Sequence, residues 1–172
     1  MTALKGAKVF VTGGSRGIGT SLVEELYARG ASRAYGTARD PRAVTHPHAV
    51  AVALEVTDPG SVSVAAAQAQ DVTVLINNAG AAVGASFLDS PVDDVVELQP
   101  RGIAVTGLHL GYVDTDLAAD VDAPKSDPRD VPALALDGGE AGAYEVLAAD
   151  ISRQVKAGLA DDLAGLYAQL SK

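Results

Sequence analysis

The residues best suited to chemistry lie in a glycine-rich turn near the start of the chain, TGGSRGIG at 12–19. The turn follows the apolar run Lys8–Thr12, which predicts a buried strand, and precedes a helical pattern over 17–29. Glycines at such a junction let the backbone approach a pyrophosphate closely and direct the helix N-terminus toward its charge. The spacing predicts a phosphate-binding turn, and the alternative is a turn without a ligand.

A second segment, NNAG at 77–80, follows another predicted strand, Val72–Ile76. Together the two segments resemble the short-chain dehydrogenase/reductase family, whose TGxxxGxG loop matches Thr12–Gly19 and whose NNAG motif is matched completely. The resemblance implies a Rossmann-like fold, a nicotinamide dinucleotide cofactor and oxidoreductase chemistry. It extends over the whole chain on either side of one gap.

Two further stretches resemble the family's cofactor site. In HLGYVDTDL at 109–117, Gly111 and Thr115 match a segment beside the nicotinamide, where the backbone of Val113 would meet the carboxamide. Leu110 replaces the family's proline there, which removes a constraint on the turn. In ALEVTDP, Glu55-Val56 stands where the family has an Asp-Val pair bordering the adenine.

The second predicted strand, Arg33–Thr37, bears on the choice of cofactor. An acid about 20 residues after the glycines would bind the ribose 2′-hydroxyl and repel a 2′-phosphate. Thr37 lies near that position, followed by Arg39, and Arg16 adds a second cation from the turn. Two guanidinium groups without an acid favour NADP over NAD. The alternative is that both arginines are solvated, and Asp40 lies close enough to complicate the choice.

The resemblance thus assigns a cofactor-binding set drawn from five segments of the chain. Its members are Thr12, Gly13, Ser15, Arg16, Gly17, Ile18, Gly19, Thr37, Arg39, Glu55, Val56, Asn78, Ala79, Gly80, Gly111, Val113 and Thr115.

The family's proton-transfer residues are missing from the sequence. The family uses a serine and a Tyr-x-x-x-Lys pair, whose spacing places both side chains on one face of a helix. None of the five tyrosines has a lysine four residues later. The segment SPVDDVVELQPRGIAV at 90–105 starts a helix with a cap and then breaks it at Pro100. It resembles the start of the family's fourth helix joined near 96–99 to the end of its fifth, which implies an internal deletion of roughly 70 residues, more than one βαβ unit.

A few other residues are candidates for catalysis or metal binding. Tyr112 is the single tyrosine in the nicotinamide-side loop by resemblance, but it has no lysine to lower a pKa that is normally near 10. We assign no other catalytic residue. Ser90 is explained as a helix cap and Ser86 does not match the family's serine, while His109 ends a strand.

His46 and His48 flank Pro47 in a loop, and two histidines alone do not define a metal site. The acidic group Asp114, Asp116, Asp120 and Asp122 lacks the spacing of a calcium loop and is read as a solvated substrate loop.

The composition limits the protein class. The chain has 172 residues, few aromatic residues, no cysteine and a net charge of −9. We expect one domain over 1–172 with a core of Ala, Val and Leu, no thiolate metal site or disulfide, and no nucleic-acid or membrane partner. The N-terminus leads directly into a strand, so we expect no signal peptide and a cytoplasmic location.

Strands and helices alternate along the chain, which predicts a doubly wound, parallel α/β fold. Further strands are expected at 49–56, 103–108 and 144–147, and further helices from Asp58 to Gln70, at 127–136 and at 151–170. Numbered as in the family, the shortened sheet would have the order 3-2-1-4-6-7. Alternatively, two chains could exchange elements to cover the exposed strand edge, so a homo-oligomer or swapped dimer is possible.

Three functions remain open at this stage. The first is an NADP-binding domain of the reductase family that has lost catalysis. The second is an active NADP-dependent oxidoreductase with an unusual proton donor. The third is a structural or interaction protein, or a deletion variant, that binds no cofactor. Nucleotide binding and slow NADPH oxidation by small aldehydes or quinones distinguish them.

Overall fold

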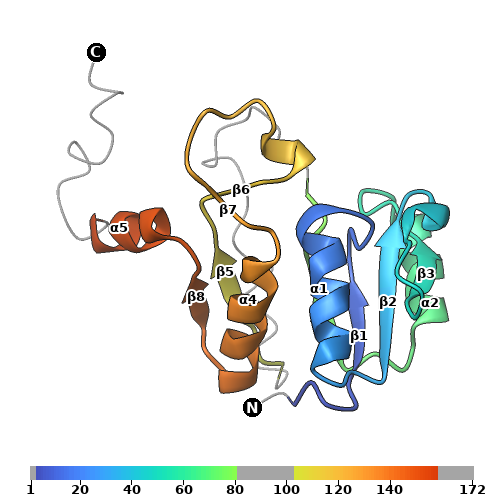
Figure 1. Cartoon of the computed structure of the whole chain (residues 1–172). Coiled ribbons are helices and arrows are strands. Elements are labelled where there is room, and N and C mark those ends of the chain that lie inside the picture. Colours follow the sequence, from blue (N-terminus) through green and yellow to red (C-terminus); the bar gives the residue numbers. More distant parts are fainter. Residues whose placement is uncertain (1–2, 81–102, 159–172) are drawn as a thin grey trace.

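The structure is a computed structural model that describes residues 3–80 and 103–158 (Figure 1). Its first half alternates strands and helices: β1 (Lys8–Val11), α1 (Gly17–Ala28), β2 (Arg33–Ala38), β3 (Val50–Ala53), α2 (Pro59–Gln68) and β4 (Val74–Ile76). The strands form one parallel sheet in the order β3-β2-β1-β4. The predicted parallel α/β fold and the first four positions of the predicted strand order are therefore confirmed.

The two helices of this half cover opposite faces of the sheet, because successive side chains of a strand point to opposite sides. Val9 and Val11 of β1 are fully buried in a cluster with Leu26 of α1. Between them, Phe10 packs into a second cluster with Ala65 of α2. The carboxyl ends of β1, β2 and β4 are thereby held at one edge of the sheet.

The second half of the described chain agrees with the prediction only in part. It contains β5 (Gly107–His109), β6 (Tyr112–Val113), β7 (Lys125–Ser126), α4 (Asp130–Ala141), β8 (Glu145–Leu147) and α5 (Asp150–Gly158). Among the described residues, β5 pairs only with β8 and β6 only with β7, both in parallel. The predicted neighbouring position of the last two strands is therefore confirmed by β5 and β8, whereas the expectation that the strand after the gap lies directly beside β4 is wrong.

The reason is that α4 positions the second half on α1 rather than on the edge of β4. Leu136 of α4 is buried in the same apolar cluster as Leu22 of α1. Arg29, at the end of α1, donates to Glu25 at 2.8 Å and to Glu140 of α4 at 3.0 Å. It also lies 2.6 Å from Asp137 of α4. Burial alone would lower the pKa of Arg29, but these hydrogen bonds outweigh it and raise the pKa.

Several element boundaries differ from the predictions. The strand expected at 49–56 covers Val50–Ala53, and the helix expected at 127–136 covers Asp130–Ala141 with Pro132 in its first turn, as expected. The short pair β6–β7 was not predicted. The short helix expected after Ser90, the proposed junction near 96–99, and the end of the helix expected at 151–170 lie outside the described residues. Within the described ranges, no helix is long and apolar enough to span a bilayer.

Candidate functional site

The glycine-rich turn between β1 and α1 is compact because two of its glycines have no room for a side chain. A Cβ on Gly19 would overlap the carbonyl oxygen of Gly13, and Gly13 itself has a φ of +69°. The turn is also bonded to the end of β2. The Thr37 hydroxyl accepts from the Gly13 N–H at 3.2 Å, and the Thr37 carbonyl accepts from Gly14 N–H at 2.8 Å. Thr37 is 1% exposed, so its hydroxyl organises the turn.

The Asn78–Gly80 segment is bonded to the same turn. The Asn78 side-chain amide donates to the carbonyl oxygens of Thr12 at 3.0 Å and Gly13 at 3.2 Å. In return, the Thr12 hydroxyl accepts from the backbone N–H groups of Asn78 and Ala79, both at 2.9 Å. Thr12 and Asn78 therefore fix the ends of β1 and β4 to each other, which a pattern of matching motifs could not reveal.

These segments enclose a cavity of about 690 Å³ at the carboxyl edge of the sheet, within the size range of small-molecule and cofactor sites. All the predicted cofactor residues except Thr12, Gly111 and Val113 line it. Its lining consists of Gly13, Ser15, Arg16, Gly17, Ile18, Gly19, Thr37, Ala38, Arg39, Leu54, Glu55, Val56, Thr57, Asn78, Ala79, Gly80, Asp114, Thr115, Asp116 and Leu117.

The N-terminus of α1 lies at this cavity, with Arg16 as its N-cap residue. Arg16 is extended, with φ −158° and ψ 167°, and no side chain caps the helix. The first turn of α1 also contains no acidic residue. The first N–H groups of a helix have no partner within it, and together with the helix dipole they favour an anion. The cavity therefore contains an anion-binding feature formed by the backbone.

Two of the charged side chains that line the cavity form an ion pair. Arg16 Nη1 lies 3.3 Å from Asp116 Oδ2. The pKa of Glu55 is lowered, chiefly by a backbone hydrogen bond from Thr57 and also by the charge of Arg39. Asp40 does not line the cavity. Its carboxylate accepts three side-chain hydrogen bonds from Arg42, at 2.8–3.2 Å, which lower its pKa.

Sequence reasoning missed part of this lining. Asp114 and Asp116 come to the cavity from the segment after β6, where they were read as parts of a solvated loop. Arg16 and Asp116 are 100 residues apart in the chain. The available signal was the position of Asp116 directly after Thr115, a residue already assigned to the site by resemblance.

The remaining candidates lie away from the cavity. Tyr112 is 53% exposed and does not line it. Val113 is buried, and a Cβ on Gly111 would lie 2.7 Å from the side chain of Ile151 in α5. His109 lies 3.8 Å from Glu145 on the β5–β8 pair.

The two loop histidines are part of an aromatic cluster. The ring of His46 stacks on that of Tyr27 with centroids 5.0 Å apart, and His48 lies edge-on to both. The His48 backbone N–H donates to His46 Nδ1 at 3.3 Å. In the described part of the chain, no three residues are grouped as a metal site.

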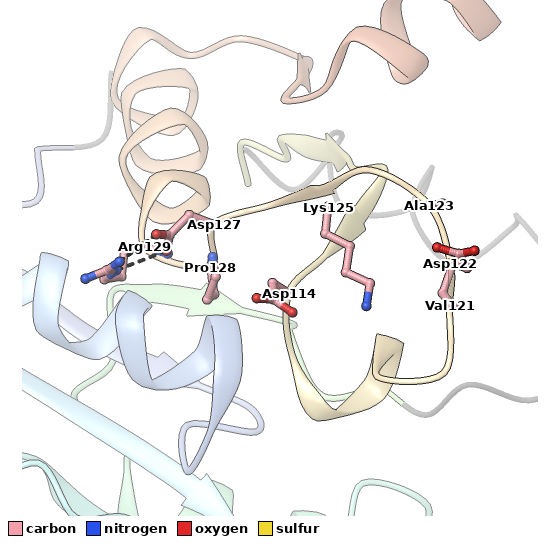
Figure 2. Close-up of a pocket in the computed structure, with 8 residues that line it drawn as sticks. All are labelled: Asp114, Val121, Asp122, Ala123, Lys125, Asp127, Pro128 and Arg129. Atoms are coloured by element: carbon pink, nitrogen blue, oxygen red, sulfur yellow. Dashed lines mark hydrogen bonds and ion pairs between the residues drawn. The ribbon is translucent and has the colours of Figure 1, made fainter.

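A second, open hollow of about 590 Å³ adjoins the cavity and shares Asp114 with it (Figure 2). Figure 2 shows the Lys125 side chain reaching into the space enclosed by the loop that carries Asp122. At its rim, Arg129 donates to Asp127 at 2.7 Å and lowers the pKa of Asp127 to about 2. The hollow is therefore polar and carries charges of both signs.

Fold and site together define a parallel α/β domain with a dinucleotide-type cavity at the carboxyl edge of its sheet. The sequence profile described as short chain dehydrogenase matches residues 7–97, more than half of the chain. The chain belongs to the short chain dehydrogenase family.

Individual proteins resemble this chain in part of their sequence or in their fold. An uncharacterized oxidoreductase of Schizosaccharomyces pombe is 42% identical over 65 residues, which cover 33% of this chain and 26% of that protein. The match thus spans about a quarter of the relative's length. A short chain dehydrogenase from Burkholderia cenocepacia, solved in complex with NADP, has 24% identity and a TM-score of 0.87, over 99% of this chain and 100% of that one. A blue fluorescent protein from a metagenomic library, solved with NADPH, has 20% identity and a TM-score of 0.64, over 85% of this chain and 97% of that one.

Proposed function

We propose that residues 1–172 form a single NADP-binding domain of the short chain dehydrogenase family in which hydride transfer is impaired. The observation that carries the proposal is the cavity itself. One space of about 690 Å³ joins an uncapped helix N-terminus, two arginines and the Asn78–Gly80 segment. These features suit the pyrophosphate, the adenosine phosphate and the nicotinamide half of one ligand.

The arrangement of acids supports NADP over NAD. Binding of the ribose 2′-hydroxyl needs an acceptor at the end of β2. Thr37 uses its hydroxyl within the glycine turn, and Asp40 is held by Arg42 outside the cavity lining. Arg39 lines the cavity beside these two residues. The solved relatives that contain NADP or NADPH support the same choice.

The impairment rests on the missing Tyr-x-x-x-Lys pair. When bound, the nicotinamide supplies a hydride, and the carbonyl that receives it needs a proton donor. No tyrosine in the sequence has a lysine four positions later, and Tyr112 lies outside the cavity lining. In this proposal the chain retains the residues that bind the cofactor and lacks those that complete the reaction, because the segment that carries them in the family is deleted near 96–99.

The test is a fluorescence titration of the full chain with NADPH and with NADH. We expect micromolar binding of NADPH, weaker binding of NADH, and selective weakening of NADPH binding in Arg39→Ala. Arg153→Ala is the charge-matched control, because Arg153 bonds to Asp150 and Leu147 and lines neither hollow. Absence of binding by both dinucleotides contradicts the proposal.

A second measurement tests the impairment. The bound NADPH is incubated with small aldehydes and quinones, and its absorbance is followed over time. We expect no oxidation above the rate without protein. Turnover that saturates with a carbonyl substrate would instead establish an active oxidoreductase with a different proton donor.

A further inference from the structure

Arg16 is held by a carboxylate of the protein at the opening of the cavity. Its side chain is 65% exposed, and Nη1 lies 3.3 Å from Oδ2 of Asp116. Asp116 is the first residue of a 3₁₀ turn, Asp116–Ala118, and comes from the second half of the chain. The Nη1 group of Arg16 is thus shared with Asp116, and a phosphate that binds Arg16 through Nη1 must compete with this carboxylate.

The segment that carries Asp116 is anchored independently of this ion pair. A Cβ on Gly17 would lie 3.1 Å from Thr115 Cγ2, so Thr115 is packed directly on the glycine turn. Val113 and Ala118, on either side, are buried at 6% and 7% exposure. Neutralising Asp116 should therefore leave the segment in place and change only the charge beside Arg16.

The charge balance of the cavity makes this carboxylate significant. Two cations, Arg16 and Arg39, face three carboxylates, Glu55, Asp114 and Asp116. A phosphate monoester adds between about −1.5 and −2 charges at neutral pH. To bind here, such a phosphate needs a guanidinium group as its partner. Arg16 is one of the two available, and it is in direct contact with the carboxylate of Asp116.

We propose that Asp116 limits the preference of this cavity for a dinucleotide that carries an additional phosphate monoester, by competing with that phosphate for Arg16. The inference rests on the proposed function and concerns a residue that sets specificity. The competition affects NADPH more than NADH, because the pyrophosphate common to both has the backbone N–H groups of α1 as its partners.

The test compares Asp116→Asn with the unchanged chain in titrations with NADPH and NADH at low ionic strength. An exposed ion pair changes an equilibrium by up to about fivefold. We expect NADPH to bind about two- to fivefold more tightly in the variant and NADH to change by less than half of that factor. Because exposed charges are screened by salt, the gain should shrink at 0.5 M salt.

Asp114→Asn is the matched control, since Asp114 lines the same cavity without contacting Arg16. An equal gain in that variant, or an equal gain for NADH, would overturn the inference, because either result indicates a general charge effect. The double variant completes the test. In an Arg16→Ala background, Asp116→Asn should no longer change the ratio of the two affinities, and a persistent change also overturns the inference.

The two proposals fail in different ways. If the unchanged chain binds NADPH and Asp116→Asn leaves the affinity ratio unchanged, the inference about Asp116 is wrong and the proposed function stands. If neither the chain nor the variant binds either dinucleotide, and both have the same thermal unfolding midpoint, both proposals are wrong.

Discussion

At the scale of single residues, the site depends on side chains that join the glycine turn to the ends of β2 and β4. Thr37 and Asn78 bond to the turn through their side chains, and the Thr12 hydroxyl at its start accepts from the N–H groups of Asn78 and Ala79. All three were assigned from the sequence as residues that contact the cofactor. Their hydrogen bonds give them a more immediate role, which is to hold the turn in shape. The contact of each with a cofactor stays a prediction.

One prediction at this scale concerns pH. The Asp127 carboxylate accepts hydrogen bonds from the side chain of Arg129. These bonds are the main reason that the pKa of Asp127 is lowered from 3.8 to about 2. A carboxyl group with a lowered folded-state pKa contributes stability above its unfolded value and loses it as the pH falls through the folded value. We expect Asp127→Asn to unfold at a lower temperature than the unchanged chain at pH 6. That gap should close between roughly pH 4 and pH 2.

Thermal unfolding followed by circular dichroism across this pH range measures the effect. Arg129→Gln removes the other partner, so its gap should close over the same range. A gap that stays constant from pH 6 to pH 2 in both variants would contradict the assignment.

At the scale of elements, α4 contains a pair of adjacent glycines whose surroundings differ. A Cβ on Gly138 would overlap the side chain of Val146 in β8, whereas nothing lies within 4 Å of a Cβ on Gly139. Alanine in a helix is favoured over glycine by about 0.5–1 kcal/mol. We expect Gly139→Ala to stabilise the protein by that amount, measured by urea unfolding.

Gly138→Ala should gain the same helix preference and lose more by separating α4 from β8, since overpacking costs about 1–3 kcal/mol. We therefore expect net destabilisation, and partial recovery in Gly138→Ala/Val146→Ala. Equal stabilisation by both single alanine variants would show that α4 and β8 are not packed as described.

The elements also show how far the sequence could predict the fold. The strands β1, β2 and β4 and the helix α1 follow from apolar runs and helical spacing, because these local patterns indicate which residues each element buries. The predicted order also placed β5 beside β8, which the structure confirms. The separation of this pair from β4 could not be predicted in this way. It depends on the docking of α4 through Arg29 and Leu136, contacts that link residues more than 100 positions apart.

The site, like the fold, could be predicted from the sequence only in part. Glycines are typical of positions where the backbone is closely approached, so Gly13 and Gly19 were recognisable from their spacing. A carboxylate can be solvated or functional in any loop, and its sequence context does not distinguish the two. Asp116 was therefore placed correctly in a loop, but its partner Arg16 became apparent only when the chain was folded.

At the scale of the whole molecule, the two halves are joined through helices, and within residues 3–80 and 103–158 no continuous sheet connects them. Figure 1 shows α4 beside α1, with β5 and β8 on the far side of α4 from the four-stranded sheet. Val9, Val11 and Ala34 of the larger sheet are completely buried. By contrast, no residue of β5 or β8 is buried, and neighbouring Tyr144 is 79% exposed.

This division predicts different local stabilities for the two sheets. A two-stranded sheet is marginal on its own, and regions with little buried apolar surface open with less free energy than the core. We expect backbone amides such as Gly107 and Ala148 of the β5–β8 pair to exchange with deuterium at least about tenfold faster than those of β1 and β2. A tenfold difference corresponds to about 1.4 kcal/mol in opening free energy.

Hydrogen exchange followed by mass spectrometry measures this difference under conditions in which opening is at equilibrium. Arg29→Met removes the ionic contacts between α1 and α4, so it should accelerate exchange in β5 and β8 more than in β1 and β2. Arg33→Met is the control, because Arg33 bonds to Asp71 and Tyr35 within the first half. Equal protection of both sheets, lowered equally by Arg29→Met, would mean that the domain unfolds as one cooperative unit and that the docking of α4 is as strong as the sheet itself.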